Sequence, residues 1–92
     1  MPRFLIEVPH EKTTLECNRA IDTFLRTGSH FLTHADWGCK DDVHSAFLIV
    51  DVETKEEARA IVPADFRGNA RVVRLTTFTP ADMDRARKAH QL

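Results

Sequence analysis

Apolar residues along the chain follow two periods, one typical of β-strands and one typical of α-helices. Short runs rich in β-branched and aromatic side chains occupy residues 3–8, 30–37, 43–52 and 70–78. Pro9 ends the first run, because proline has no N–H group to donate to a neighbouring strand. The pattern therefore predicts four short strands separated by longer connections.

Helix-start signals fall between these runs. Residues 13–16 and 54–57 each have the spacing of a capping box, in which a threonine and a glutamate three positions later satisfy free backbone N–H groups. Apolar residues then recur at i, i+3, i+4, i+7 and i+8 over residues 17–25, and Gly28 provides a stop. A third helix is predicted at the C-terminus and is expected to fray by His90.

The predicted order of elements is β-α-β-β-α-β followed by a C-terminal helix. This order is that of the ferredoxin-like α+β sandwich, in which both helices cover one face of an antiparallel sheet with strand order 4-1-3-2. A chain of 92 residues has room for one core of this kind. Residues 1–92 are therefore expected to form a single ferredoxin-like domain.

The predicted sheet carries apolar side chains on both faces. Residues 46–50 read Ala-Phe-Leu-Ile-Val with no polar position, although helices on one side would leave alternate residues facing water. An exposed apolar face of this kind favours association. We expect a homodimer that packs sheet against sheet. The alternative is that the C-terminal helix folds back over this face.

Charge and composition narrow the classes of function. The 13 basic and 14 acidic residues give a net charge of -1, which excludes the basic footprint of a nucleic-acid-binding protein. No apolar run approaches the roughly 20 residues that span a bilayer, and the N-terminus lacks the unbroken apolar core of a signal peptide. We therefore predict a soluble, cytoplasmic protein with two free thiols. Cys17, on the apolar side of its helix, is interpreted as a small buried hydrophobe.

The predicted topology brings several polar residues to one end of the sheet. If Asp36 pairs with His44 across the hairpin formed by the second and third predicted strands and the loop of residues 38–42, these two side chains share a face with His34. Imidazole and carboxylate groups suit iron, manganese, zinc or nickel, and a thiolate favours zinc or copper. The sequence therefore predicts a transition-metal site for zinc, copper, nickel or iron, with the candidate ligands His10, His34, Asp36, Cys39 and His44.

Other interpretations of the same residues stay open. A metal-free pocket would use His34 or His44 as a general acid or base, because histidine titrates near neutral pH. Glu7 is suited equally to a general base in a dimer cavity and to an inter-subunit ion pair. The histidines can also be structural residues, and a slip of one residue in register would turn His44 to the opposite face.

The element order over residues 3–78 resembles the dimeric α/β-barrel superfamily of ferredoxin-like proteins. That superfamily includes muconolactone isomerase-like proteins, antibiotic-biosynthesis-type monooxygenases and YciI-like proteins. Residues 4–11 (FLIEVPHE) and 33–39 (THADWGC) also look like segments of small uncharacterised bacterial proteins. The resemblance implies a homodimer with a small-molecule pocket between the helix-free sheet face and the second subunit.

Three functions follow from these observations, because a fold alone does not determine an activity. The first is binding of a transition metal at the His/Asp/Cys site. The second is a cofactor-free isomerase or monooxygenase that acts on a small cyclic compound. The third is a non-enzymatic interaction module that uses the apolar sheet face to assemble with a partner.

Overall fold

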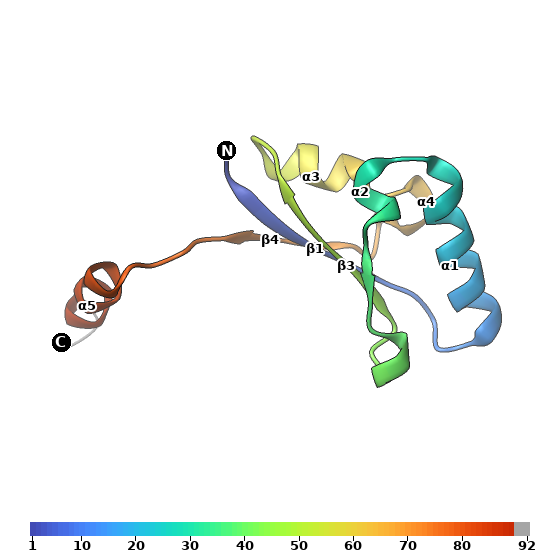
Figure 1. The fold of residues 1–92 in the computed structure, drawn as a ribbon, viewed down its shortest axis with the longest axis horizontal. Helices are drawn as coiled ribbons and strands as arrows, with labels where there is room; N and C mark the ends of the chain where they lie inside the picture. The colour runs from blue at the N-terminus through green and yellow to red at the C-terminus, as the bar shows by residue number, and fades with distance from the viewer. Residues whose placement is uncertain (90–92) are drawn as a thin grey trace.

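The computed structural model describes residues 1–89 as an α+β fold built on a four-stranded antiparallel sheet (Figure 1). The strands are β1 (Arg3–Pro9), β2 (Asp36–Trp37), β3 (Ser45–Asp51) and β4 (Arg71–Leu75). Their order across the sheet is β2-β3-β1-β4, with antiparallel pairing throughout. The predicted strand order is confirmed, and the arrangement is compatible with a ferredoxin-like sandwich.

The helices within residues 1–89 are α1 (Thr14–Thr27), α2 (His30–Thr33), the 3₁₀ turn η1 (Cys39–Asp41), α3 (Lys55–Ile61), α4 (Ala64–Arg67) and α5 (Pro80–Ala89). Three of them, namely α1, α3 and α5, lie where the sequence signals place them, and α2, η1 and α4 are additional short helical turns. Thr13 and Thr54 cap α1 and α3 by accepting hydrogen bonds from backbone N–H groups three residues later, at 3.0 and 3.1 Å. Gly28 ends α1 at φ 69°, a left-handed conformation that favours glycine. The expected fraying at His90 lies outside the described residues.

The predicted strand over residues 30–37 is wrong in its first half. This part forms helix α2, in which the Thr33 N–H donates to the Ser29 carbonyl at 3.0 Å, and only the two residues of β2 pair with β3. A short apolar run does not distinguish a strand from a helical turn. The helix prevails here, and it buries Leu32 in the core at 3% exposure.

Two further boundaries differ from the prediction. The connection between α3 and β4 contains a short helix, α4, for which no start or stop signal was identified in the sequence. Strand β4 ends at Leu75 instead of continuing to Phe78. Leu75 pairs with Arg3, the first residue of β1, so the backbone beyond Leu75 has no strand beside it to bond.

A single layer of helices packs on one face of the sheet and forms the core with it (Figure 1). Alternate side chains of β1, β3 and β4 point to this face. Trp37 of β2 lies against Phe24 of α1 with ring centroids 5.0 Å apart and packs on the core, so it anchors the short strand β2 to the helical layer. The buried apolar residues are Phe4, Ile6, Val8, Ala20, Phe24, Leu32, Ala46, Leu48, Val50, Ala58, Val62, Phe66, Ala70 and Val72.

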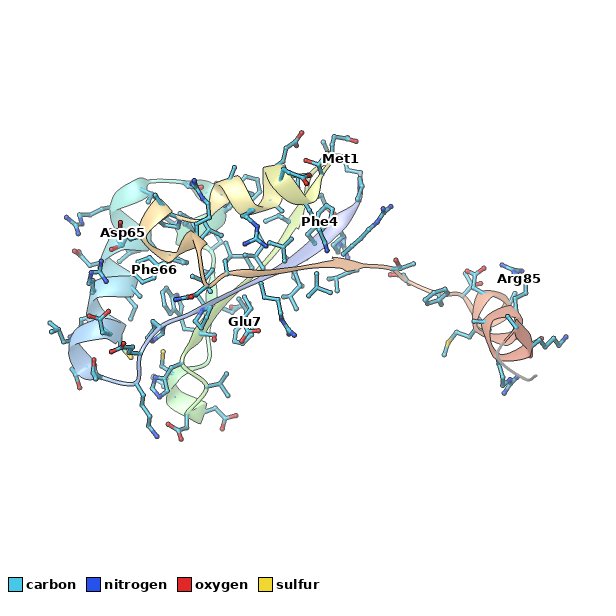
Figure 2. All side chains as sticks on the ribbon, turned by 180° about the vertical axis from the view of Figure 1, so that it is seen from behind. Met1, Phe4, Glu7, Asp65, Phe66 and Arg85 are labelled. Carbon is cyan, nitrogen blue, oxygen red and sulfur yellow. The ribbon has the colours of Figure 1, made fainter. Side chains whose placement is uncertain are left out.

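The other face of the sheet carries no helix in the described part of the chain. Figures 1 and 2 show α5 held away from the sheet at the end of an extended segment. The C-terminal helix therefore does not fold back over this face within its own chain, which contradicts that alternative. Across residues 1–89, no helix combines the length and the apolar character needed to cross a membrane.

Candidate metal centre

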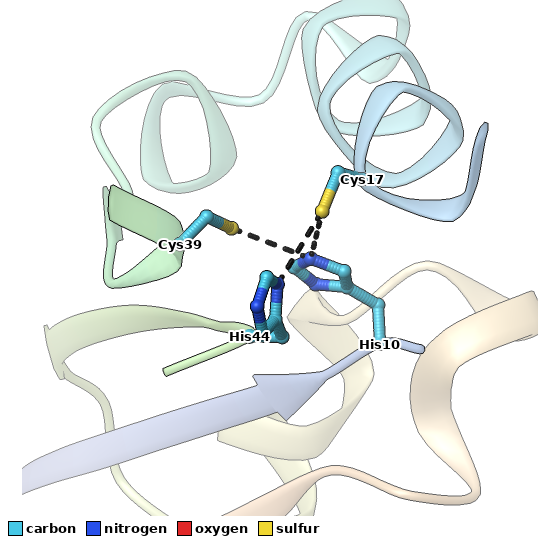
Figure 3. A group of neighbouring side chains, drawn as sticks. All are labelled: His10, Cys17, Cys39 and His44. Atoms are coloured by element: carbon cyan, nitrogen blue, oxygen red, sulfur yellow. Dashed lines mark hydrogen bonds between the residues drawn. The ribbon is translucent and has the colours of Figure 1, made fainter. Parts of the chain in front are cut away.

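Four side chains of metal-binding chemistry meet beyond the end of β1 (Figure 3). They are His10, Cys17, Cys39 and His44, and one ligand atom from each lies within 4.8 Å of the other three. All four residues are partly buried. They come from the segment after β1, from the start of α1 and from the loop between β2 and β3. Three of the four belong to the predicted ligand set.

His10 is fixed by its backbone and by a neighbouring ring. Its N–H donates to the carbonyl of His44 at 2.9 Å, which continues the pairing of β1 with β3 beyond the strand end. Its imidazole lies against the indole of Trp37, with ring centroids 5.9 Å apart. The Nε2 atom points toward both cysteine sulfurs, so His10 presents this nitrogen to the cluster (Figure 3).

Cys17 enters the cluster from the first turns of α1. Its N–H donates to the carbonyl of the cap residue Thr13 at 2.9 Å, so helix geometry fixes the position of the thiol. Its sulfur lies 3.1 Å from His10 Nε2 and 3.5 Å from His44 Nδ1. Sequence reasoning missed this ligand by interpreting it as a buried hydrophobe. The available signal was the short connection from His10, because a helix that starts there must place its first turns near the strand end.

The loop between β2 and β3 supplies Cys39 and His44. The carbonyl of Gly38 accepts two backbone N–H groups of this loop at 3.0 Å, one of them from Val43, which makes the loop compact. A Cβ on Gly38 would lie 2.7 Å from the Val43 carbonyl oxygen, so the closure requires glycine. Asp42 completes the turn in the left-handed region at φ 61°. The closed loop holds the thiol and the imidazole within reach of α1.

A carboxylate orients the His44 ring. Asp42 Oδ1 accepts a hydrogen bond from His44 Nε2 at 3.1 Å, which places the proton on Nε2 and directs the free electron pair of Nδ1 toward the cluster. Lys12 forms an ion pair with the same carboxylate at 2.7 Å. Hydrogen bonds from Lys12 and His44 hold the pKa of Asp42 below its usual range. Carboxylates commonly orient metal-ligating histidines in this way.

The distances between donors match those around a tetrahedral metal ion. Zinc lies about 2.3 Å from sulfur and about 2.1 Å from nitrogen, which separates a sulfur and a nitrogen ligand by about 3.6 Å. The corresponding separations here are 3.1 Å for Cys17–His10, 3.3 Å for Cys39–His10 and 3.5 Å for Cys17–His44. A small expansion of the cluster would therefore give metal-binding geometry.

The surroundings favour the uncharged forms of two of these groups. Burial lowers the pKa of His10, and the charge of His44 lowers it further against an opposing effect of Glu16. Burial raises the pKa of the Cys39 thiol, and its hydrogen bond with Cys17 adds to the shift. A neutral imidazole is ready to bind a metal ion. A bound cation would remove the thiol proton, because coordination stabilises the thiolate.

These shifts predict how the metal-free protein responds to pH. The pKa of His10 is lower in the folded chain than its ordinary value of 6.5 in the unfolded chain. The unfolded chain therefore binds this proton first as pH falls below 6.5, and the free energy of unfolding decreases. The raised pKa of Cys39 has the opposite sign, and its contribution is lost as pH rises above 9.0. Urea midpoints measured with a chelator and a thiol reductant should therefore fall on both sides of neutral pH. The variant His10→Gln should lose the part of the acid-side decrease that begins near pH 6.5, and an unchanged decrease in this range would contradict the prediction.

His34 and Asp36, two of the five predicted ligands, lie outside the cluster of four side chains. Strand β2 pairs Asp36 with Phe47 instead of His44, a difference of three positions. An odd shift in register reverses the face of a side chain, so Asp36 points to the helix-free face. His34 follows α2, where its Nδ1 lies 2.8 Å from the carbonyl oxygen of His30 and its ring is exposed.

Glu7 lies on the helix-free face of the sheet, whereas the cluster lies with the helices. Its carboxylate accepts a hydrogen bond from Ser45 Oγ at 3.1 Å and forms an ion pair with Arg71 at 3.3 Å, both within one chain. This pairing accounts for the residue without an inter-subunit contact. The three residues predicted as catalytic, Glu7, His34 and His44, thus occupy three different environments.

Comparisons with known proteins give no relative from which to transfer a function. No protein-family model matches this sequence, and no curated protein or solved structure shows significant similarity to the chain. The resemblance to the dimeric α/β-barrel superfamily therefore stays a prediction. The site is interpreted from its own geometry.

Proposed function

We propose that the protein binds one zinc ion through His10 Nε2, Cys17 Sγ, Cys39 Sγ and His44 Nδ1. The observation that supports this function is the convergence of two thiols and two imidazoles at separations close to those of a tetrahedral site. Two cysteines and two histidines are a common ligand set of structural zinc.

The composition of the cluster favours zinc over the other metals that the sequence allowed. The carboxylate of Asp36 is absent from the described cluster and the thiol of Cys17 is present. This exchange removes the donor type preferred by iron and manganese and gives two soft sulfur donors. Copper(I) shares the preference for sulfur and is the competing ion.

The proposed role of the ion is to fasten together three segments of the chain. Four protein ligands fill a tetrahedral coordination sphere, which is the arrangement of structural sites, whereas catalytic zinc keeps a position for water or substrate. Apart from the sheet and the core, the segment after β1 and the loop between β2 and β3 are joined by the Lys12–Asp42 ion pair and by the backbone hydrogen bond from His10 to His44. Zinc would lock this end of the domain.

The site is open to metal exchange. A surface pocket of about 380 Å³ is lined by both cysteines and His44, with Lys12 and Lys40 at its rim. An ion can therefore enter, and a chelator can approach, without unfolding of the chain. This access allows equilibrium titrations on the folded protein.

Elemental analysis of protein purified with a thiol reductant and without a histidine tag tests the proposal. One zinc per chain is expected, and a chromophoric chelator should withdraw it reversibly in a competition titration. Protein that holds far less than one metal per chain and binds none on titration would contradict zinc binding. Stoichiometric copper(I) that zinc cannot displace would contradict the choice of ion.

Loss of the carboxylate beside His44 should weaken the site without removing a ligand. Asp42→Ala is expected to lower zinc affinity by about 10- to 100-fold, because the His44 ring loses the acceptor that sets its tautomer and orientation. Asp41→Ala is the matched control, since this adjacent residue of η1 is exposed and lies outside the cluster. Equal affinities for the two variants in the competition titration would exclude an orienting role of Asp42.

A further inference from the structure

Helix α5 is stabilised by interactions between neighbouring residues but does not pack against the rest of its own chain. The Thr79 N–H donates to Asp82 Oδ2 at 3.1 Å and the Asp82 N–H donates to Thr79 Oγ1 at 3.1 Å, which is a reciprocal cap at the helix start. Ion pairs along the helix join Asp84 to Arg87 and Lys88. No described residue of α5 is buried.

A helix of this length needs a surface to pack on. Isolated helices shorter than about 12 residues are only marginally stable in water, because the free energy gained from a few turns of hydrogen bonds does not offset the cost of nucleating the helix. The chain that carries α5 is extended, with a radius of gyration of 16.1 Å against about 12 Å for a compact chain of this length. Phe78 and Met83 remain 55% and 62% exposed. The arm, defined as residues 76–89, therefore presents apolar side chains that its own chain does not cover.

The helix-free face of the sheet also presents apolar side chains that its own chain does not cover. Leu5 pairs with Ile49 on one side and with Val73 on the other, so three apolar side chains form a row across β3, β1 and β4. Phe47 adds to this row from the next position along β3 on the same face. Ile49 is 62% exposed, and Leu5 and Val73 beside it are partly exposed.

The charges on this face leave little obstacle to burial. Arg3 pairs with Asp51 at 3.3 Å on one side of the apolar row, and Glu7 pairs with Arg71 at 3.3 Å on the other. Each of these four charges already has a partner of opposite sign within the chain, and Asp36 lies at the β2 edge of the face, opposite Phe47. A covering element would therefore not leave these groups without a counter-charge.

The connection to α5 favours a second chain as the source of that element. Residues 76–79 read Thr-Thr-Phe-Thr, which contains no glycine, asparagine or aspartate and favours an extended backbone. The segment leads α5 away from its own sheet (Figures 1 and 2). Four extended residues span up to about 14 Å, and they start at Leu75, beside the row that needs cover.

We propose that two copies of this chain exchange their C-terminal arms, so that α5 of each copy packs on the helix-free sheet face of the other. With a two-fold axis near the Leu75 end of the sheet, each arm covers the helix-free face of the other copy. Both arms and both faces are then buried, and the dimer is closed. Met83 and Phe78 would contact the apolar row that contains Ile49. This assembly is independent of the zinc site, because none of these residues belongs to the cluster.

Light scattering on the full chain tests the exchange. The wild-type protein should have about twice the 10.5 kDa mass of one chain. Met83→Glu and Ile49→Glu are each expected to weaken dimerisation by at least about 10-fold, because either places a charge in the new interface. Leu25→Glu is the matched control, since this residue is 59% exposed on α1 and lies apart from the interface. It should leave the dimer intact.

A mixed dimer of isotope-labelled and unlabelled chains provides the direct measurement. Intermolecular nuclear Overhauser effects between the Met83 methyl of one chain and the Ile49 methyls of the other are expected. A monomeric wild-type protein would overturn the proposal. So would a dimer that Ile49→Glu disrupts and Met83→Glu does not, because the sheet faces would then associate without the arms.

Discussion

Replacing Cys17 by serine is expected to lower zinc affinity by at least about 100-fold, since even the loss of an outer-shell partner costs 10- to 100-fold. The sulfur of Cys17 lies 3.1 Å from His10 Nε2 and 3.5 Å from His44 Nδ1, so it stands between the two imidazoles. Serine keeps the size of the side chain but offers a hydroxyl that is a poor zinc ligand at neutral pH. Cys39→Ser should have an effect of the same order.

Two further variants distinguish the observed cluster from the ligand set that the sequence predicted. His34→Ala and Asp36→Asn should leave zinc affinity unchanged, because both side chains are exposed and lie outside the cluster. Competition titration of the four variants against one chelator provides the comparison. Loss of zinc from His34→Ala together with retention by Cys17→Ser would overturn the assignment of the site.

Removal of zinc is expected to lower the free energy of unfolding and the melting temperature of the protein. The core is small, since one layer of helices covers one face of the sheet. An ion that binds only the folded chain stabilises it by about 2.7 kcal/mol when free zinc is 100 times the dissociation constant. For a domain of this size, that corresponds to a rise in melting temperature of about 11 to 22 °C.

Thermal unfolding with and without a chelator measures this effect. The wild-type protein should lose the whole increment when the chelator is added and regain it when zinc is restored. The double variant Cys17→Ser/Cys39→Ser is the control, because its melting temperature should not respond to either addition. A wild-type melting temperature that is the same with chelator and with excess zinc would show that the ion does not fasten this end of the domain.

The strands and caps were predictable because their signals are local. The threonines at positions 13 and 54 cap α1 and α3 as their spacing indicates, and Gly28 ends α1 as a left-handed stop. The order β2-β3-β1-β4 follows from the sequence of elements and the rules of connection. The strand predicted over residues 30–37 is wrong in its first half, because a short apolar run fits a helical turn and a strand equally well.

For the candidate metal site, the sequence was sufficient to predict three of the four residues that come together. His10, Cys39 and His44 were identified because the topology brings the segment after β1 beside the loop before β3. Asp36 was included because the prediction assumed its pairing with His44, and that register is wrong, since the structure pairs Asp36 with Phe47. Cys17 was excluded because helical periodicity assigns a face to a residue and does not say what that face meets.

The sequence by itself determined that one small domain would combine four strands with capped helices and gather imidazoles and a thiol at one end of the sheet. Only the tertiary structure decided that Cys17 is the fourth member of the His/Cys cluster and that α5 stands away from the sheet. The physical reason is that caps and periodicity act between residues a few positions apart. Strand register and the packing of α1 over the end of β1 depend on contacts between distant segments, and one odd step in register moves a ligand to the other face.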